Sequence, residues 1–223
     1  RTLLLVGVVT LLLVGAAALT FNFILSSEPH ELSGRWDIYH YYGPLTFYVD
    51  NRLHAGEFPF WNPLSYCGVP NTGNPQSFIF YPINLLRGGL NAQPTPYSTL
   101  LSLCIMWAAH YVMMGVFTFC LGRAHKLSVP AALTAAITLL FSAIMVRRLS
   151  EFHFLTTMAW LPAILLCLKL CFDAAAGKSK LFYASSAGFL LGISILGGFL
   201  QIVNLMGVTL GLYSLFYVFL RPS

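Results

Sequence analysis

The sequence has little charge. Only 9% of its 223 residues are Asp, Glu, Lys or Arg, whereas 57% are hydrophobic, and the mean hydropathy is +0.75. Soluble domains carry about 25% charged residues, so this composition excludes an ordinary soluble domain and predicts an integral membrane protein. The formal net charge of +5 does not indicate a nucleic-acid partner, because the basic residues are scattered and lie mostly at the ends of apolar runs.

Metal and disulfide patterns are also lacking. The sequence has no CxxC pair, no HExxH and no Cys/His spacing that suggests zinc. Four of the five cysteines lie within apolar runs (Cys104, Cys120, Cys167 and Cys171), and Cys67 has no obvious disulfide partner. The sequence therefore implies no cofactor, and a divalent metal is not indicated. No repeat of 20–50 residues is visible either, which argues against a repeat architecture.

Long apolar runs are what the sequence contains instead. A helix needs about 20 apolar residues to cross the bilayer core. We expect six spans, at about 2–25, 98–121, 129–146, 154–172, 181–196 and 199–220, with "LGGF" (196–199) separating the last two. The chain starts at Arg1 with an apolar run and stops abruptly after "FLRPS". We therefore expect residues 1–223 to form one membrane domain of a longer protein.

The short loops predict the orientation, because basic residues favour the cytoplasmic side. Six basic residues fall on one side of the predicted spans: Arg1, Arg123, Lys126, Lys178, Lys180 and Arg221. We assign that side to the cytoplasm, so that residues 26–97 form a large outer loop. Arg147 and Arg148 fall on the outer side, against the bias, and need another explanation.

The outer loop has two parts. Residues 33–43 and 44–56 have helical character, and Gly43–Pro44 is expected to break the helix between them. The second segment has an apolar stripe that can lie on the membrane surface, which leaves Asp50 pointing away from the membrane. Residues 56–82 hold five of the chain's 12 prolines. Because proline fixes φ and removes a donor, we expect an ordered loop without regular structure there. Ordered loops of such length are usually functional.

Asp37 is the acidic residue best placed for catalysis. It follows the first span and lies among Trp36, Tyr39, His40 and Tyr41. A carboxylate at the membrane surface can act as a general base. The alternative is a surface acid paired with Arg35 or His40.

Arg147 and Arg148 lie in "RRLSEFH" (147–153) on the outer side, beside Glu151 and His153. Two guanidinium groups there can hold a phosphate. The alternative is pairing with Glu151 and with anionic lipid headgroups.

These features together suit a sugar attached to a lipid phosphate. Aromatic rings stack on sugar rings and amides bond hydroxyls, so we expect Trp61, Asn62, Asn74 and Gln76 to shape a sugar pocket. A phosphate leaves as a stable anion and needs no acid. One base is then sufficient, unlike the two carboxylates of a glycosidase.

A family resemblance points the same way. The stretch "GEFPFWNPLSYCGVPNTGNPQSFIFYPIN" (56–84) resembles the GxxPxWNP…G.P…NPQ…FYP.N signature of the bacterial YfhO-like membrane proteins of the GT-C glycosyltransferase superfamily. "WDIYHYYGP" (36–44), "MAWLP" (158–162) and "LGGFLQI" (196–202) are also similar to motifs of this family. The resemblance implies a GT-C-like helical bundle in the bacterial inner membrane, with amphipathic surface helices in its first outer loop. The family's catalytic acid would fall on Asp37.

The resemblance also implies the partners: membrane lipid, a polyprenyl-phosphate sugar as donor, and a glycan or lipid as acceptor. Relatives often have Gly-His-Pro-Gln where this chain has Gly198-Phe199-Leu200-Gln201. A non-catalytic accessory subunit of a larger membrane complex, with other membrane subunits as partners, is therefore the alternative function. Transport is a weaker third, because no predicted span centre carries paired charges.

Overall fold

The structure is a computed structural model that describes residues 7–11, 13–15, 18, 37–148, 151–175 and 177–220. Within these ranges the chain is mostly helical, and its strands are limited to one short antiparallel hairpin in which β1 (Trp61–Asn62) pairs with β2 (Val69–Pro70). The all-α membrane class expected from composition is confirmed at this level. The expected first span at 2–25 lies largely outside the described residues.

Five helical segments of the described part are long and apolar enough to cross a membrane: α4 (Pro96–Ala124), α5 (Val129–Leu140) with α6 (Ala143–Arg147), α7 (Phe152–Met158) with α8 (Leu161–Asp173), α9 (Lys178–Leu196), and α10 (Leu200–Leu215) with η6 (Phe216–Leu220). They match the last five predicted spans to within a few residues at each end. Apolar length alone was enough to locate them, because a bilayer-spanning helix needs an unbroken apolar run.

Short polar residues and prolines fix where the helices begin. Thr95 accepts a hydrogen bond from the Ser98 amide at 3.0 Å and forms a capping box at the start of α4, where Pro96 occupies the first turn. Ser128 caps α5 through the Ala131 amide. These caps satisfy amide groups that a helix end leaves unpaired.

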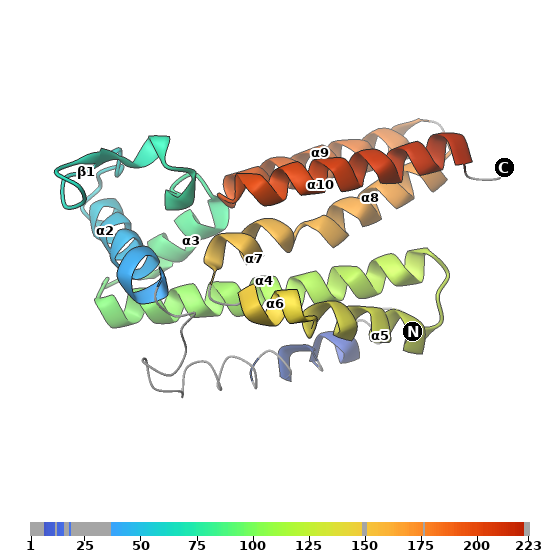
Figure 1. The fold of residues 1–223 in the computed structure, drawn as a ribbon, viewed down its shortest axis with the longest axis horizontal. Coiled ribbons are helices and arrows are strands. Elements are labelled where there is room, and N and C mark those ends of the chain that lie inside the picture. The colour runs from blue at the N-terminus through green and yellow to red at the C-terminus, as the bar shows by residue number, and fades with distance from the viewer. Residues whose placement is uncertain are drawn as a thin grey trace.

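Helix α4 is the centre of the bundle. It packs against α5 on one side and α8 on the other, with α9 beyond α8 (Figure 1). Its buried face carries Trp107, whose ring stacks on Phe152 with centroids 4.1 Å apart, and Tyr111, whose hydroxyl donates to the Leu140 carbonyl at 2.6 Å. Helices α9 and α10 bury much less of their surface and present apolar side chains outward.

The outer-loop elements gather at one end of the bundle (Figure 1). In chain order they are η2 (Ile38–Tyr42), α2 (Gly43–His54), the hairpin, the 3-10 turns η3 (Asn71–Gly73) and η4 (Pro75–Ser77), and α3 (Pro82–Leu90). Regular structure between residues 56 and 81 is limited to these very short pieces, as its prolines predicted. Helix α3, in contrast, was not predicted.

The expected helix break at Gly43–Pro44 is wrong. η2 is a π-helical turn that runs directly into α2, and the Gly43 amide donates to the Ile38 carbonyl. The wider π turn brings that carbonyl close, since a Cβ on residue 43 would lie 2.8 Å from it. Glycine therefore fits this site, and Pro44 is tolerated because it occupies the first turn of α2. Gly56 ends α2 as expected, with a φ of 73°.

A buried chain of hydrogen bonds joins the outer loop to the bundle. The His110 Nδ1–H group donates to the Met106 carbonyl at 2.7 Å, so its Nε2 accepts a hydrogen bond from the Tyr81 hydroxyl. The Tyr81 oxygen in turn accepts from Trp160 Nε1 at 3.0 Å. Burial raises the pKa of Tyr81, which keeps it a neutral donor. The end of the outer loop is thereby held against α4 and α8.

Candidate functional site

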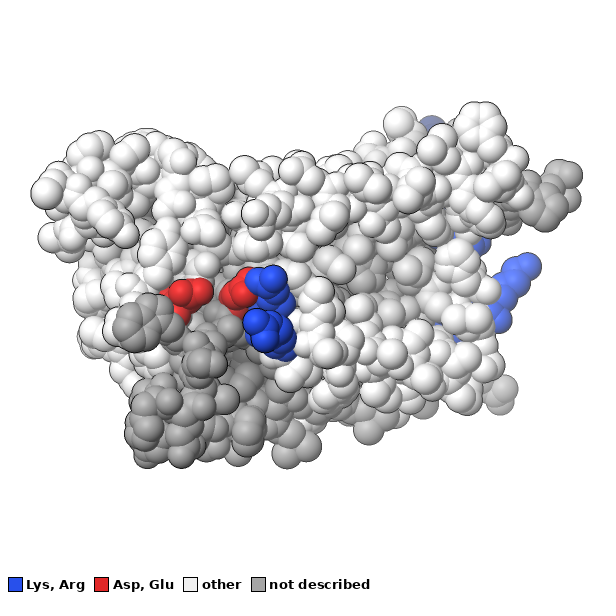
Figure 2. All heavy atoms as spheres, viewed as in Figure 1, with Lys and Arg blue, Asp and Glu red and all other residues white. Residues whose placement is uncertain are grey.

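Charge is distributed unevenly between the two ends of the bundle. Among the described residues, the outer-loop end carries four of the acidic side chains (Asp37, Asp50, Glu57 and Glu151), and the opposite end carries only Asp173. Figure 2 shows acidic and basic side chains side by side on one face near the outer-loop end. Charges are costly in apolar surroundings. This charged face is therefore the strongest candidate for a functional site.

Asp37 is exposed and stands at the start of η2, where its side chain makes no capping hydrogen bond. Tyr42, at the other end of η2, is buried. Burial is the main cause that raises the pKa of Tyr42 above its usual value of 10.0. The nearby groups of Asp37, Tyr41 and Glu151 raise this pKa further, in decreasing order of effect. Tyr42 therefore lies within electrostatic range of both carboxylates and remains a neutral phenol at physiological pH.

The two predicted arginines differ in their surroundings. The Arg148 guanidinium forms an ion pair with Glu151 and lies 5.9 Å from the centroid of the Phe154 ring. Arg147 is exposed and makes no hydrogen bond or ion pair with any residue the structure describes. The alternative reading, pairing with Glu151, is thus confirmed for Arg148, whereas Arg147 remains open to an anion.

Asp37, Glu151 and the two arginines form a charged cluster around Tyr42. Asn74 and Gln76 belong to a loop segment that reaches this cluster through η2. Asn74 Oδ1 accepts from the Gln76 amide at 3.0 Å, and Asn74 Nδ2 donates to the Tyr41 hydroxyl at 2.8 Å. The loop is therefore tied directly to η2, which Asp37 precedes. Gln76 is half-buried, and in the described part of the chain its side-chain amide makes no hydrogen bond. Of the predicted sugar-binding amides, Gln76 is the one available to a ligand.

Trp61 and Asn62 lie elsewhere, in the β1–β2 hairpin at the tip of the loop (Figure 1). The Trp61 ring is 53% exposed and covers Gly68, where an added Cβ would lie 2.5 Å from the ring. Asn62 is buried; its Oδ1 accepts from the Leu64 amide at 2.9 Å, and its Nδ2 donates to Ser65 Oγ at 3.2 Å. The Asn62 side chain thus bonds within the hairpin, and the Trp61 carbonyl accepts from the Tyr48 hydroxyl of α2 at 2.6 Å. Their part in a sugar pocket stays a prediction.

His153 is the most unusual side chain beside the cluster. It is fully buried, its ring lies 4.3 Å from the Tyr42 ring and 5.0 Å from the Phe78 ring between centroids, and neither ring nitrogen has a hydrogen-bond partner in the described structure. An unpaired buried polar group costs about 1–3 kcal/mol. The sequence placed His153 near the arginines, but its burial depends on η2 and Phe78, which come from distant parts of the chain.

Asp50 and Arg87 form a second polar centre, which the sequence did not indicate. Asp50 was expected to point away from the membrane, yet it is fully buried and accepts two hydrogen bonds from the Arg87 guanidinium, at 2.6 and 2.9 Å. Thr99 donates to Asp50 at 3.1 Å, and Arg87 also donates to Asn84 and Ser102. The expectation is wrong because α3 and α4 cover this side of α2 and supply partners for the carboxylate.

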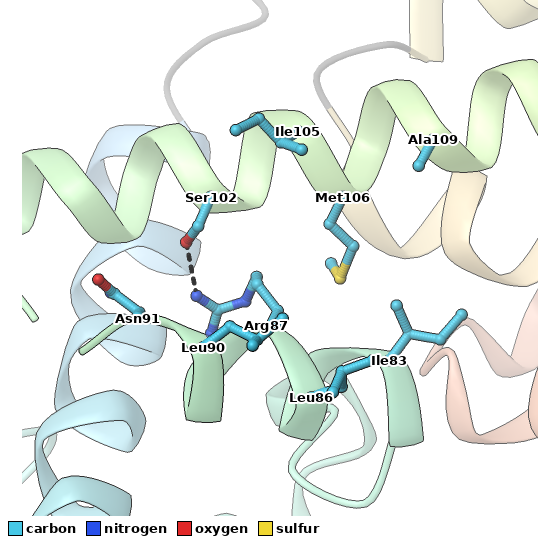
Figure 3. A pocket seen from close by; sticks show the side chains of 9 residues that line it. All are labelled: Ile83, Leu86, Arg87, Leu90, Asn91, Ser102, Ile105, Met106 and Ala109. Carbon is cyan, nitrogen blue, oxygen red and sulfur yellow. Dashed lines mark hydrogen bonds between the residues drawn. The ribbon is translucent and has the colours of Figure 1, made fainter.

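The Arg87 side chain forms the floor of an open groove of about 540 Å³ between α3 and α4 (Figure 3). The walls are mainly apolar and come from both helices: Ile83, Leu86 and Leu90 on α3, and Ile105, Met106 and Ala109 on α4. Because Arg87 is already engaged with Asp50, Asn84 and Ser102, the groove offers mostly apolar contact. It suits lipid chains better than a polar substrate.

Among the described residues, no group of three or more His, Cys, Asp or Glu side chains is arranged to hold a metal ion. Comparison with known proteins yields no match, whether with a protein-family model, a curated protein or a solved structure. The family resemblance of the 56–84 stretch therefore stays a prediction.

Proposed function

We propose that this protein is a membrane glycosyltransferase of GT-C type that transfers a sugar from a polyprenyl-phosphate donor to an acceptor hydroxyl on the extracytoplasmic side of a bacterial inner membrane. The observation that carries the proposal is the cluster at the outer-loop end. An exposed carboxylate, Asp37, and a second carboxylate, Glu151, both lie within electrostatic range of Tyr42, and Glu151 pairs with Arg148. The cluster stands at the end of a bundle of apolar helices, where a lipid-linked substrate would present its phosphate.

Each group has a defined part in the reaction. Asp37 takes the proton of the acceptor hydroxyl as the oxygen forms its bond to the anomeric carbon. The bond between that carbon and the phosphate oxygen breaks, and the phosphate leaves with the electron pair. Arg147, which is exposed, stabilises the negative charge that grows on the phosphate. Arg148 contributes when its guanidinium contacts the phosphate as well as Glu151. Attack and departure on opposite faces invert the anomeric centre.

The sugar itself would be held by the loop. The half-buried Gln76 amide has unused donors and an acceptor for hydroxyl groups, and Asn74 fixes the loop through Tyr41. Trp61 offers an exposed ring face at the hairpin tip. If Trp61 takes part, it contacts an extended acceptor rather than the reacting sugar, because the hairpin lies apart from Asp37.

Two observations favour the alternative, a non-catalytic accessory subunit. Arg148 is already paired with Glu151, and Asn62 uses its amide within the hairpin. Both are arrangements that a scaffold would retain. The exposed apolar faces of α9 and α10 would then pack against another membrane subunit.

Replacement of Asp37 by asparagine tests the proposal. Because Asp37 is exposed and makes no capping hydrogen bond, Asp37→Asn should leave the fold and the thermal midpoint unchanged. Loss of a general base should lower transfer by about 10²-fold or more. The measurement is label transfer to membrane glycans or lipids, with the full chain in membranes and radiolabelled polyprenyl-phosphate glucose, galactose or mannose as donor.

Glu57→Gln is the matched control, because Glu57 is an exposed acid of the same loop that pairs with Arg52. It should retain full transfer. Unchanged turnover in Asp37→Asn would overturn the assignment of the base. Absence of transfer by the wild-type chain with all three donors would favour the accessory subunit.

A further inference from the structure

The end of the bundle opposite the outer loop contains a small pocket that the proposed function does not use. Its volume is about 260 Å³. Residues of three segments line it: Ala124, the last residue of α4, with His125 and Lys126 that follow it; Lys169 of α8; and Phe216 and Tyr217 of η6. Two lysines and two aromatic residues therefore line one cavity at this end of the bundle.

Lys169 is the first unusual feature of this pocket. It lies within the apolar helix α8 and is only 6% exposed. Its ammonium group pairs with Asp173 and lies 5.9 Å from the Tyr217 ring centroid, and Tyr217 stacks on Phe172 at 5.0 Å. Ionisable residues in membrane helices are costly and usually serve a function. Here the charge is placed at the wall of a cavity.

Lys126 is the second, independent feature. It has a φ of 65°, and the amides of Lys126 and Leu127 donate to the carbonyls of Arg123 and Gly122. This pattern is a Schellman motif, whose left-handed position usually holds glycine. Helix α2 ends with the same pattern and uses Gly56 there. A lysine in this conformation costs about 1 kcal/mol or more, and such strain points to a functional demand for the side chain.

We propose that this pocket binds the phosphate group of an anionic membrane lipid. Lys126 and Lys169 contribute two positive charges, and Asp173 neutralises one of them, so one net positive charge remains for a phosphodiester. The His125 ring and the Tyr213 hydroxyl, joined by a 3.0 Å hydrogen bond, lie beside it. Basic pockets at the ends of membrane helices bind anionic headgroups in this way.

A lipid fits better than a free phosphate because of what adjoins the pocket. Phe216, which lines it, is 50% exposed, and Leu212 and Val208, one and two turns earlier, continue an exposed apolar surface along α10 toward the middle of the span. An acyl chain can follow that surface while the headgroup remains at the lysines. The inference does not depend on the glycosyltransferase proposal, because no group of the Asp37 cluster takes part.

The variant Lys126→Gly tests the role of the lysine charge without adding backbone strain at residue 126. The glycine removes the ammonium group and relieves the backbone strain, so the variant should be at least as stable as wild type without lipid. Its affinity for phosphatidylglycerol should fall about fivefold, the usual effect of one lysine at an anionic surface. The measurement is thermal unfolding of the full chain in detergent, titrated with phosphatidylglycerol, phosphatidylcholine or inorganic phosphate.

Lys126→Arg and Lys180→Gln are the controls. The arginine keeps the charge and should keep the stabilisation by phosphatidylglycerol. Lys180 is an exposed lysine of α9 at the same end but outside the pocket, so its loss should have no effect. Equal stabilisation of wild type and Lys126→Gly, or equal effects of the two lipids, would overturn the proposal. Stabilisation by inorganic phosphate but not by phosphatidylglycerol would overturn the assignment to a lipid.

Discussion

Buried polar residues differ in how well they are satisfied, and the difference separates structural from functional candidates. Asp50 and Arg87 satisfy each other, with help from Asn84, Ser102 and Thr99. His153 has no such partners in the described structure, although it is equally buried. A satisfied network stabilises one conformation, so we assign Asp50 and Arg87 to structure and keep His153 beside the candidate site.

The buried Asp50–Arg87 ion pair should be important for stability. Asp50→Leu and Arg87→Met should each lower the free energy of unfolding by about 3–5 kcal/mol, because each leaves its partner buried and charged. The double variant should lose less than the sum, since the second change removes the unpaired charge. Thermal or denaturant unfolding in detergent measures all three.

Arg52→Met provides the comparison. Arg52 and Glu57 form an ion pair in which both side chains are substantially exposed. Such pairs contribute about 1 kcal/mol or less, so this variant should remain close to wild type. Additive losses in the Asp50–Arg87 double variant would show that the two charges are not coupled.

At the scale of elements, the break between α9 and α10 positions the outer loop. Gly198 has a φ of 93°, and a Cβ there would lie 2.5 Å from the Pro75 carbonyl oxygen. The Gly197 carbonyl accepts from Thr156 at 3.0 Å, which fixes the break against α7. Because Pro75 lies between Asn74 and Gln76, this contact sets where the loop meets the charged cluster.

Gly198→Ala should therefore disturb both stability and the loop. The Cβ meets a backbone atom that cannot move alone, and the left-handed φ adds strain, so we expect a loss of about 2 kcal/mol or more. Gly207→Ala is the matched control, because nothing lies within 4 Å of its added Cβ and the site is within α10. It should be neutral or slightly stabilising. Unfolding midpoints of the two variants in detergent check this, and equal midpoints would contradict the contact.

At the scale of the whole molecule, the two ends of the bundle differ in charge. In the described part of the chain, the end with the α4–α5 and α8–α9 connections carries five basic residues (Arg123, Lys126, Lys169, Lys178 and Lys180) and one acid, Asp173. The outer-loop end carries four basic and four acidic residues: Arg52, Arg87, Arg147 and Arg148 with Asp37, Asp50, Glu57 and Glu151. Positive charge favours the cytoplasmic side, so the outer loop should face outward.

Cysteine labelling tests this orientation. Cys67 is exposed in the outer loop, whereas Cys104 and Cys171 are buried. A membrane-impermeant maleimide should label Cys67 in intact spheroplasts. In a Cys67→Ser background, Ser179→Cys should react only after the membrane is opened, because Ser179 is exposed at the basic end. The reverse pattern would show the opposite orientation.

The sequence alone determined the class of the protein and five of its spans. Length and apolar continuity fix a membrane helix locally, which is why "LGGF" correctly separated the last two spans. The prolines of residues 56–82 predicted an irregular loop for the same reason, since each acts on its own φ and on its own hydrogen bond.

Only the tertiary structure decided what the polar residues do. Asp50 became a buried partner of Arg87, and Arg148 was paired with Glu151. The Asn74 amide reached Tyr41, and Lys126 and Lys169 came to line one pocket. A polar side chain's role depends on the groups packed around it, and those groups come from distant parts of the chain. A span is set by its own residues, whereas a site is set by which spans and loops meet.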